Sequence, residues 1–205
     1  LKVWERSVEP VTNSCLLCGV GGQGTVLASK MIAFAAMEKG ENVRTAETIG
    51  MAQRGGSVVS HVRVGGSIKS PIIPMHGADV LIAFEPAEAV RCLDYLKEGG
   101  MVIVNKKAVK PVTSSLAGSE YDGKEMLSYL QRKVKKLVLV DGDAVCAKCG
   151  SAKVLNMALL AAAVKAGALP MDIKELESAI EKRLPERFRE INLKAIHMTE
   201  GEVMP

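Results

Sequence analysis

Residues 15–24 read C-L-L-C-G-V-G-G-Q-G, an apolar run that passes directly into a glycine-rich turn, and a long helix-forming stretch follows from Thr25. A glycine-rich turn between a buried strand and a helix brings backbone N–H groups close to an anion, and the helix N-terminus adds the positive end of its dipole. Gly19, Gly21 and Gly24 fit the spacing G-x-G-x-x-G, which predicts a phosphate-bearing ligand. The same glycines also suit close packing of a strand against a helix, so this structural interpretation stays open beside the functional one.

Strands and helices alternate along the chain after this turn. We expect strands over 14–18, 42–47, 57–64, 78–84, 101–105 and 137–140, and helices over 25–39, 86–97, 123–135, 144–149 and 152–166. The helix over 25–39 is apolar nearly all round, which predicts that it is buried. Asp172 and Glu175 form a capping box that begins a further helix. The order predicts an α/β fold of three layers with a mainly parallel, Rossmann-like sheet and a C-terminal helical extension.

Length and composition indicate a single globular unit. The 205 residues are 48% hydrophobic and 24% charged, enough for one well-buried core. We expect a loose N-terminal tail over 1–13 and a single domain over 14–205. No stretch resembles a signal peptide or is long enough to span a bilayer, which predicts a cytoplasmic protein without a membrane partner. With 3% aromatic residues and a net charge of +4 from scattered basic residues, no nucleic-acid partner is expected.

Five cysteines include two C-x-x-C pairs, Cys15/Cys18 and Cys146/Cys149. Residues three apart in a strand project to opposite faces, so Cys15 and Cys18 cannot readily chelate one ion. The second pair alternates with small residues, as in a closely packed helix, and the two pairs lie too far apart for a compact zinc site. We therefore predict reduced thiols and no metal site.

An acidic residue raises the alternative of dinucleotide binding. Glu47 lies at the end of the second expected strand, where dinucleotide-binding proteins place the acid that binds a ribose. Such a fold requires a crossover helix after that strand, whereas here a glycine-rich turn leads directly into the next expected strand. A free-standing NAD(P)-binding oxidoreductase stays an alternative, as does a non-catalytic structural scaffold whose glycine turn only packs.

A second distinctive segment covers residues 47–63, E-T-I-G-M-A-Q-R-G-G-S-V-V-S-H-V-R. Within it Arg54 can pair bidentately with a phosphate or carboxylate, although a β-turn with a surface arginine is the simpler interpretation. His61 lies in a strand alternation and is expected to be packed or hydrogen-bonded rather than catalytic. The chain has no Walker lysine, H-E-x-x-H, G-x-S-x-G, ferredoxin-type cysteine run or thiamine-diphosphate signature. No residue stands out as catalytic, which predicts a subunit rather than a whole enzyme.

Four segments together resemble one family. They read G-V-G-G-Q-G-T-V-L-A-S-K, E-T-I-G-M-A-Q-R-G-G-S-V-V-S-H-V-R, A-F-E-P and K-V-L-N-M-A-L-L. The chain is similar, over about residues 14–200, to the gamma-type subunit or domain of 2-oxoacid:ferredoxin oxidoreductases. Its G-M-A-Q-R-G-G-S-V-V-S-H variant most resembles the beta subunit of the indolepyruvate branch of that family.

The resemblance implies a complex that oxidatively decarboxylates arylpyruvates to acyl-CoA while it reduces ferredoxin. Thiamine diphosphate and iron–sulfur clusters are then expected on a large partner subunit, and this chain helps to form the active site and the coenzyme A site and is inactive alone. The glycine-loop amides and Arg54 are expected to face CoA phosphates or the partner's cofactor pocket, with orienting hydrogen bonds from Gln53 and Thr48. The full set of expected ligand-binding residues is Gly19, Gly21, Gly22, Gln23, Gly24, Thr48, Gly50, Met51, Gln53, Arg54, Gly55 and Gly56.

Overall fold

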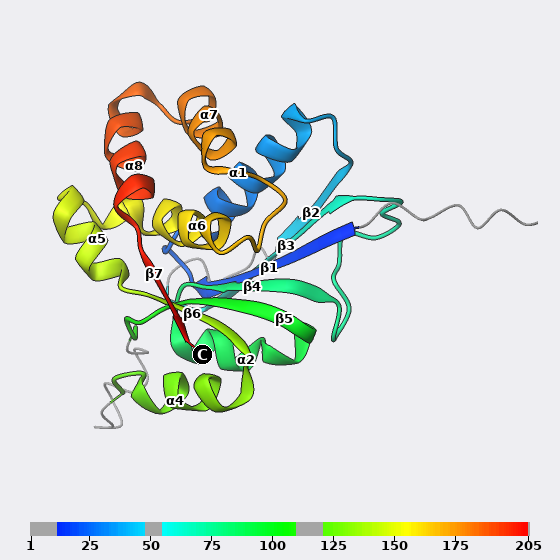
Figure 1. The fold of residues 1–205 in the computed structure, drawn as a ribbon, viewed down its shortest axis with the longest axis vertical. Helices are drawn as coiled ribbons and strands as arrows, with labels where there is room; N and C mark the ends of the chain where they lie inside the picture. Colours follow the sequence, from blue (N-terminus) through cyan, green and yellow to red (C-terminus); the bar gives the residue numbers. More distant parts are fainter. Residues whose placement is uncertain (1–11, 48–54, 110–120, 205) are drawn as a thin grey trace, which may run out of the picture.

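A computed structural model describes residues 12–47, 55–109 and 121–204, which form one layered α/β unit (Figure 1). The described strands build a seven-stranded sheet in the order β2-β3-β1-β4-β5-β6-β7. Their bounds are β1 Thr12–Val20, β2 Val43–Glu47, β3 Ser57–Gly65, β4 Ala78–Ala83, β5 Leu96–Asn105, β6 Lys136–Val140 and β7 Gly201–Met204. Strands β1, β4, β5 and β6 are parallel, whereas β2, β3 and β7 pair antiparallel at the two sides. The α/β class with a parallel centre is confirmed, and antiparallel strands extend the sheet at both edges.

Helices cover both faces of the sheet, which confirms the three-layer arrangement (Figure 1). Helices α1, α6 and α7 lie on one side, and α2 and α4 lie on the other. The helices are α1 Thr25–Glu38, α2 Pro86–Arg91, α4 Lys124–Lys133, α5 Gly142–Cys149, α6 Leu155–Lys165, α7 Ile173–Arg183 and α8 Glu186–Met198, with the short 3₁₀ turns η2 Leu93–Tyr95 and η3 Ala152–Val154. Successive residues of β1 enter opposite layers: Cys15 and Leu17 pack under α1 and α6, whereas Leu16 and Cys18 pack over α2 and α4. The predicted divergence of Cys15 and Cys18 is thereby confirmed.

The connections between the strands indicate at which edge of the sheet a ligand can bind. Helix α1 follows β1 on one face and α2 follows β4 on the other, although β1 and β4 are neighbouring parallel strands. The chain therefore leaves these two strands in opposite directions. In open α/β sheets a ligand binds outside the carboxyl ends of the strands at such a switch point. The glycine turn after β1 lies at this position.

Two expectations about the middle and the end of the chain are wrong. The helix expected over 86–97 stops at Arg91, and Gly99 and Gly100 lie inside β5, where its register against β4 shifts and Gly99 takes φ +74°. Gly99 and Gly100, which the sequence pattern assigns to the end of a helix, thus lie in a β-bulge. Strand β7 has no counterpart among the expected strands. It is only four residues long, and Gly201 lies so close to β6 that an added Cβ would come within 2.6 Å of Val138.

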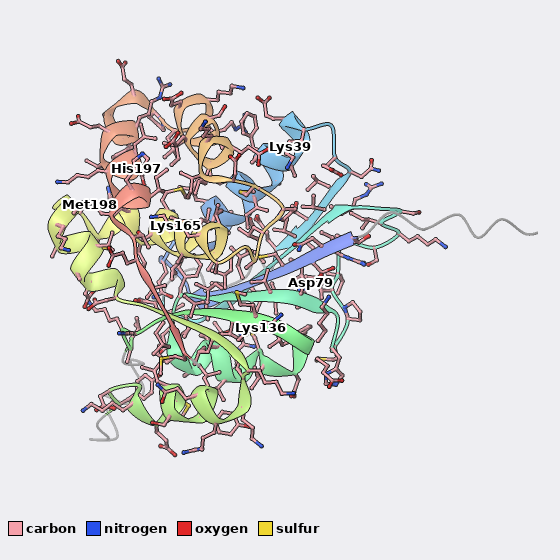
Figure 2. All side chains as sticks on the ribbon, viewed as in Figure 1. Lys39, Asp79, Lys136, Lys165, His197 and Met198 are labelled. Atoms are coloured by element: carbon pink, nitrogen blue, oxygen red, sulfur yellow. The ribbon has the colours of Figure 1, made fainter. Side chains whose placement is uncertain are left out.

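The C-terminal helices form the expected extension and are tied back to the sheet layer. The capping box of Asp172 and Glu175 is confirmed at the start of α7. The Lys39 ammonium group donates to the Pro170 carbonyl at 2.9 Å and lies 3.2 Å from the Glu175 carboxylate. On α6, Lys165 donates to the Thr199 carbonyl at 2.7 Å, directly after α8. Figure 2 labels Lys165 and Met198, the last residue of α8. These bonds fix α7 and α8 against α1 and α6.

Helix α1 departs from its expected burial. Its inner face is buried, but Val26 and Leu27 are each 38% exposed and Met37 is 62% exposed. The sequence prediction that the whole helix is buried is therefore wrong for its outer face. The core covers only the inner face of this helix and leaves apolar side chains on its outer face exposed.

Candidate functional site

The two glycine-bearing turns, which lie about 30 residues apart in the sequence, are hydrogen-bonded to each other. Gly21 N–H donates to the Gly56 carbonyl at 2.8 Å, and Gly55 N–H donates to the Gly21 carbonyl at 3.4 Å. These bonds prolong the antiparallel pairing of β1 and β3 beyond the ends of both strands. Gly22 and Gly55 are exposed, so the joined turns form one surface that is open to solvent. The expected site residues Thr48, Gly50, Met51, Gln53 and Arg54 lie outside the described residues.

The Gln23 side chain shapes the turn itself. Its Oε1 accepts a hydrogen bond from Val20 N–H at 2.7 Å, and its Nε2 donates to the Phe84 carbonyl at the end of β4 at 3.1 Å. Gly19 is buried beneath it, and a Cβ at this position would lie 2.7 Å from Gln23 Oε1 and 2.8 Å from Phe84 Cβ. Both polar ends of Gln23 thus bond within the chain, and its backbone N–H also donates, to the Val20 carbonyl at 3.2 Å. Gln23 therefore holds the turn in its conformation.

The N-terminus of α1 presents unused backbone donors. Its N-cap is Gly24, in a left-handed conformation with φ 90°, and no side chain caps the first turn. The first helical hydrogen bond runs from Ala28 N–H to the Gly24 carbonyl at 3.0 Å. The N–H groups of the first turn therefore have no acceptor within the helix. The first turn also lacks an acidic residue, so the positive end of the helix dipole is not neutralised there.

These donors face a pocket of about 490 Å³. It is lined by Gly22, Gln23, Gly24, Leu27, Lys107, Val109, Asp143, Cys146, Ala152, Lys153, Leu155 and Asn156. The two lysines come from the end of β5 and from η3, so segments far apart in the sequence supply positive charge to one hollow. Lys107 pairs with Asp143 at 2.9 Å, whereas the Lys153 ammonium group lies 5.6 Å from the centre of the Phe188 ring. An anion that reaches the glycine turn would meet N–H groups and cations together.

Asn156 is the most informative side chain of this pocket. It is 4% exposed, and its Oδ1 accepts a hydrogen bond from Met157 N–H at 2.9 Å. Its Nδ2 group lies against the turn, 2.8 Å from where a Cβ on Gly24 would be. Among the described residues no acceptor is found for this Nδ2 group. A donor that borders a pocket and has no acceptor in the chain can bind a ligand or water there.

A second group of polar side chains stabilises the neighbouring strand ends. Asn105, 1% exposed, donates to the Phe84 carbonyl and accepts from Gly142 N–H, both at 3.2 Å. The bonds connect the ends of β4 and β5 to the start of α5. Sequence analysis missed this residue, although a polar residue directly after an apolar strand was the available signal.

Glu85 is the other buried polar residue at this edge, with 2% exposure. Its carboxylate accepts from Glu88 N–H at 3.0 Å, which caps α2, from Val109 N–H at 3.4 Å, and from the Tyr121 hydroxyl group. Burial and the neighbouring Glu85 carboxylate raise the pKa of Tyr121, so this phenol stays a donor at physiological pH. The A-F-E-P segment was singled out from the sequence, but the role of Glu85 within it was not.

Glu47 and His61 lie away from the glycine turns. Glu47 accepts a hydrogen bond from the Ser29 hydroxyl group of α1 at 2.9 Å. His61 is 8% exposed, accepts from Ile73 N–H at 3.2 Å through Nδ1, and packs edge-on against Tyr95. Burial lowers the pKa of His61, which keeps the ring neutral. The prediction of a packed, hydrogen-bonded histidine is confirmed.

The five cysteines divide into two classes by exposure. Cys15, Cys18 and Cys92 are buried, whereas Cys146 and Cys149 are partly exposed on α5. In the part of the chain that the structure describes, no group of three or more His, Cys, Asp or Glu side chains could hold a metal ion. Nor does any described helix combine the length and apolar character needed to cross a bilayer.

Alkylation of the folded protein is expected to modify Cys146 and Cys149 and to spare the other three cysteines. Burial, with the Asp143 carboxylate, raises the pKa of the Cys146 thiol, so its reaction with iodoacetamide should be slow at neutral pH and accelerate as pH rises. Peptide mass spectrometry at several pH values measures this directly. Rapid labelling of Cys15 or Cys18 without denaturant would contradict the packing of β1.

Comparison with known proteins places this arrangement in a family. The model of the pyruvate ferredoxin/flavodoxin oxidoreductase family matches residues 14–199. The indolepyruvate oxidoreductase subunit IorB of Archaeoglobus fulgidus is 38% identical over 184 residues, which are 89% of this chain and 91% of that protein. The gamma subunit of a keto/oxoacid ferredoxin oxidoreductase from Geobacter sulfurreducens has a similar structure, with a TM-score of 0.65 and 25% identity over 92% of this chain and 94% of that one.

A third similar structure belongs to a longer chain. It is the 2-oxoglutarate:ferredoxin oxidoreductase of Magnetococcus marinus, solved with 2-oxoglutarate, coenzyme A and succinyl-CoA bound. The TM-score is 0.66 at 18% identity, and the match covers 91% of this chain and 30% of that one. At this identity the likeness concerns the fold. The extent of the family match and the identity to the Archaeoglobus protein show that this chain belongs to the pyruvate ferredoxin/flavodoxin oxidoreductase family and is related to its separate, small oxidoreductase subunits.

Proposed function

We propose that this chain is the small subunit of an indolepyruvate or arylpyruvate:ferredoxin oxidoreductase and forms one domain from residue 14 onward. The complex would decarboxylate the 2-oxoacid oxidatively, form an acyl-CoA and reduce ferredoxin. A large partner subunit would carry thiamine diphosphate and the iron–sulfur clusters. The identity to an indolepyruvate oxidoreductase subunit supports this choice of substrate class. The cysteines, all free, support a reducing compartment, and we propose the cytoplasm.

The pocket beside the glycine turn carries the proposal that this chain binds coenzyme A. Its uncapped helix N-terminus, Lys107, Lys153 and the unpaired amide of Asn156 suit a phosphate-bearing ligand. The pocket also has an apolar side formed by residues such as Leu27 and Leu155, which suits the uncharged parts of the molecule.

Coenzyme A supplies the thiol that accepts the acyl group. The residues of this chain would bind its phosphates through the backbone N–H groups of Gly22, Gly24 and the first turn of α1, and through Lys107 and Lys153. Because the joined glycine turns are open to solvent, a ligand held there can extend toward a partner chain. Binding fixes the position of the acceptor, and such proximity lowers the entropic barrier to transfer. The chain is therefore proposed to position its substrate and to contribute no acid, base or nucleophile.

Co-expression with the cognate large subunit is expected to give a stable heteromer that oxidises arylpyruvate with coenzyme A. Arg54→Ala should lower kcat/KM for coenzyme A about tenfold or more without preventing assembly, since a bidentate arginine–phosphate pair would be lost. Arg132→Ala, an exposed position on α4, is the matched control and should leave turnover unchanged. Full turnover by the Arg54→Ala complex would remove this residue from the site.

Coenzyme A is expected to slow the alkylation of Cys146 but not that of Cys149. Only Cys146 lines the pocket, although both thiols belong to α5. The comparison therefore has an internal control on one helix. The measurement is the ratio of the two modification rates with and without coenzyme A, on the heteromer. Equal protection by NADH, or saturable NADH binding in calorimetry, would instead favour a free-standing dinucleotide-dependent oxidoreductase.

A further inference from the structure

The outer stripe of helix α1 is apolar and uncovered. We define it by its members at helical spacing: Val26, Leu27, Lys30, Ala33, Phe34 and Met37. Met37 at its far end is the most exposed large apolar residue of the described chain, at 62%. A helix that is apolar all round is typical of one covered on both sides. The sheet and helices α6 and α7 cover the inner face and part of Phe34, whereas Val26, Leu27 and Met37 are exposed, so the rest of the outer stripe has the composition of an interface without its partner.

A cavity of about 590 Å³ lies along this stripe, between α1 and strand β2. Its lining comprises Lys30, Ala33, Phe34, Met37, Thr45, Ala46, Glu47 and Arg183. The Arg183 guanidinium group of α7 lies 4.9 Å from the centre of the Phe34 ring and closes one side. The cavity thus offers an aromatic and aliphatic floor, with Lys30, Arg183 and Glu47 as its charged residues. This cavity is distinct from the pocket beside the glycine turn, with which it shares no lining residue.

Strand β2 forms the other wall of the cavity and is an edge of the sheet. Among the described residues it pairs only with β3, which leaves the backbone groups of its outer side without a neighbouring strand. Figure 1 shows α1 and β2 next to each other at this end of the sheet. An exposed edge strand is a template for the addition of an extended segment, whose alternate side chains then enter an adjacent groove.

The charges around the groove indicate the chemistry of its occupant. Lys30 and Arg183 line the groove and have no carboxylate partner among the described residues, whereas the nearby Lys39–Glu175 and Lys182–Glu38 pairs are internally neutralised. The Glu47 carboxylate, which also lines the groove, accepts a hydrogen bond from the Ser29 hydroxyl group. The two unpaired cations favour an acidic occupant. A second copy of this chain on the same face would oppose like charges, because a two-fold contact brings identical patches together.

We propose that an extended, acidic segment of the large partner subunit adds to the edge of β2 and inserts an apolar side chain into the groove beside Met37. This inference rests on the proposed function only in that the chain is a subunit of a heteromer. The outer stripe begins at Val26 and Leu27, on the first turn of α1 next to the glycine turn. The same partner would therefore be held close to the coenzyme A pocket while docking on a separate surface.

The test uses the full chain and its cognate large subunit. Met37→Asp and Lys30→Glu are expected to raise the Kd of the heteromer at least about tenfold, since one buries a charge in the groove and the other repels an acidic segment. Met75→Asp is the matched control, because Met75 is 57% exposed elsewhere on the surface, and Lys135→Glu controls for charge reversal. Both controls should stay within about twofold of the native Kd. Circular dichroism and thermal melting check that each variant is folded.

Hydrogen exchange supplies the readout for strand addition. The amides of β2, Val43–Glu47, should gain protection when the heteromer forms, and a photo-crosslinker at position 37 should attach to an acidic segment of the large subunit. The proposal would be overturned if Met37→Asp bound the large subunit with native affinity, or if hydrogen exchange of β2 were unchanged in the heteromer. In either case a stable heteromer would leave the proposed function intact. The proposal would also be overturned if the isolated chain formed a dimer that Met37→Asp abolishes, or if removal of residues 1–11 abolished the protection of β2. If the native chains do not associate at all, the proposed function itself fails.

Discussion

Replacement of Gly24 by alanine is expected to weaken coenzyme A binding by the heteromer at least about tenfold. Gly24 has φ 90°, a conformation that costs a residue with a Cβ about 1–3 kcal/mol. The added Cβ would also lie 2.8 Å from Asn156 Nδ2, so the amide or the turn must move. Either movement displaces the first N–H groups of α1 from the position in which they face the pocket. Isothermal titration of the heteromer with coenzyme A measures the loss.

Two other glycines separate the causes of this effect. Gly40, at the opposite end of α1, has φ +76° with no atom within 4 Å of an added Cβ, so Gly40→Ala adds backbone strain far from the pocket. It should lower thermal stability and leave coenzyme A affinity unchanged. Gly22, with φ +102°, also has free space, so Gly22→Ala adds strain in the turn without touching Asn156. The difference between Gly24→Ala and Gly22→Ala then reports the contact with Asn156. Native affinity in Gly24→Ala would exclude the turn from the binding site.

The sequence predicted the central layers well because their signals are local. The alternation of β1 side chains between the two layers and the capping box of α7 each follow from neighbouring residues, and both are confirmed. Strand β7 was missed because four residues carry too little pattern, and its position depends on a partner strand more than 60 residues earlier. The helix expected to run to Lys97 failed for a related reason. A bulge that accommodates Gly99 and Gly100 is determined by the pairing of β5 with β4.

The candidate site was predicted only in part, again because the sequence carries local signals and not tertiary contacts. The glycine spacing located the turn, and the second motif located its neighbour, but no local pattern shows that Gly21 and Gly56 are hydrogen-bonded. The sequence predicts that Gln23 meets a ligand, but it does not show that the two polar ends of this side chain bond to Val20 and to the end of β4 and so hold the turn together. Contacts between strand ends are tertiary features. They decide which polar residue faces a ligand and which one holds the turn together.

Glu85→Ala is expected to destabilise the chain by about 2–4 kcal/mol, because buried donors that lose their acceptor each cost about 1–3 kcal/mol. The carboxylate accepts from Glu88 N–H, from Val109 N–H and from the Tyr121 hydroxyl group, and it is 2% exposed. For a chain of this size the melting temperature should fall by roughly 5–15 °C. Differential scanning calorimetry and urea unfolding measure the change.

The graded series around Glu85 distinguishes a hydrogen-bonding role from simple packing. Glu85→Gln keeps one acceptor oxygen and nearly the same volume, so its loss should lie between those of the native chain and Glu85→Ala. Tyr121→Phe removes the hydroxyl group that donates to Glu85 and accepts from Ala87 N–H, whereas Tyr129→Phe, at a 37% exposed position on α4, provides the matched control. Only Tyr121→Phe should be destabilising, by about 1–2 kcal/mol for two hydrogen bonds at a partly exposed phenol.

Combining Tyr121→Phe with Glu85→Ala should cost less than the sum of the two changes, because the variants remove one shared hydrogen bond. Additive losses would mean that the carboxylate and the phenol act independently, and that the hydrogen bond between them contributes little to stability.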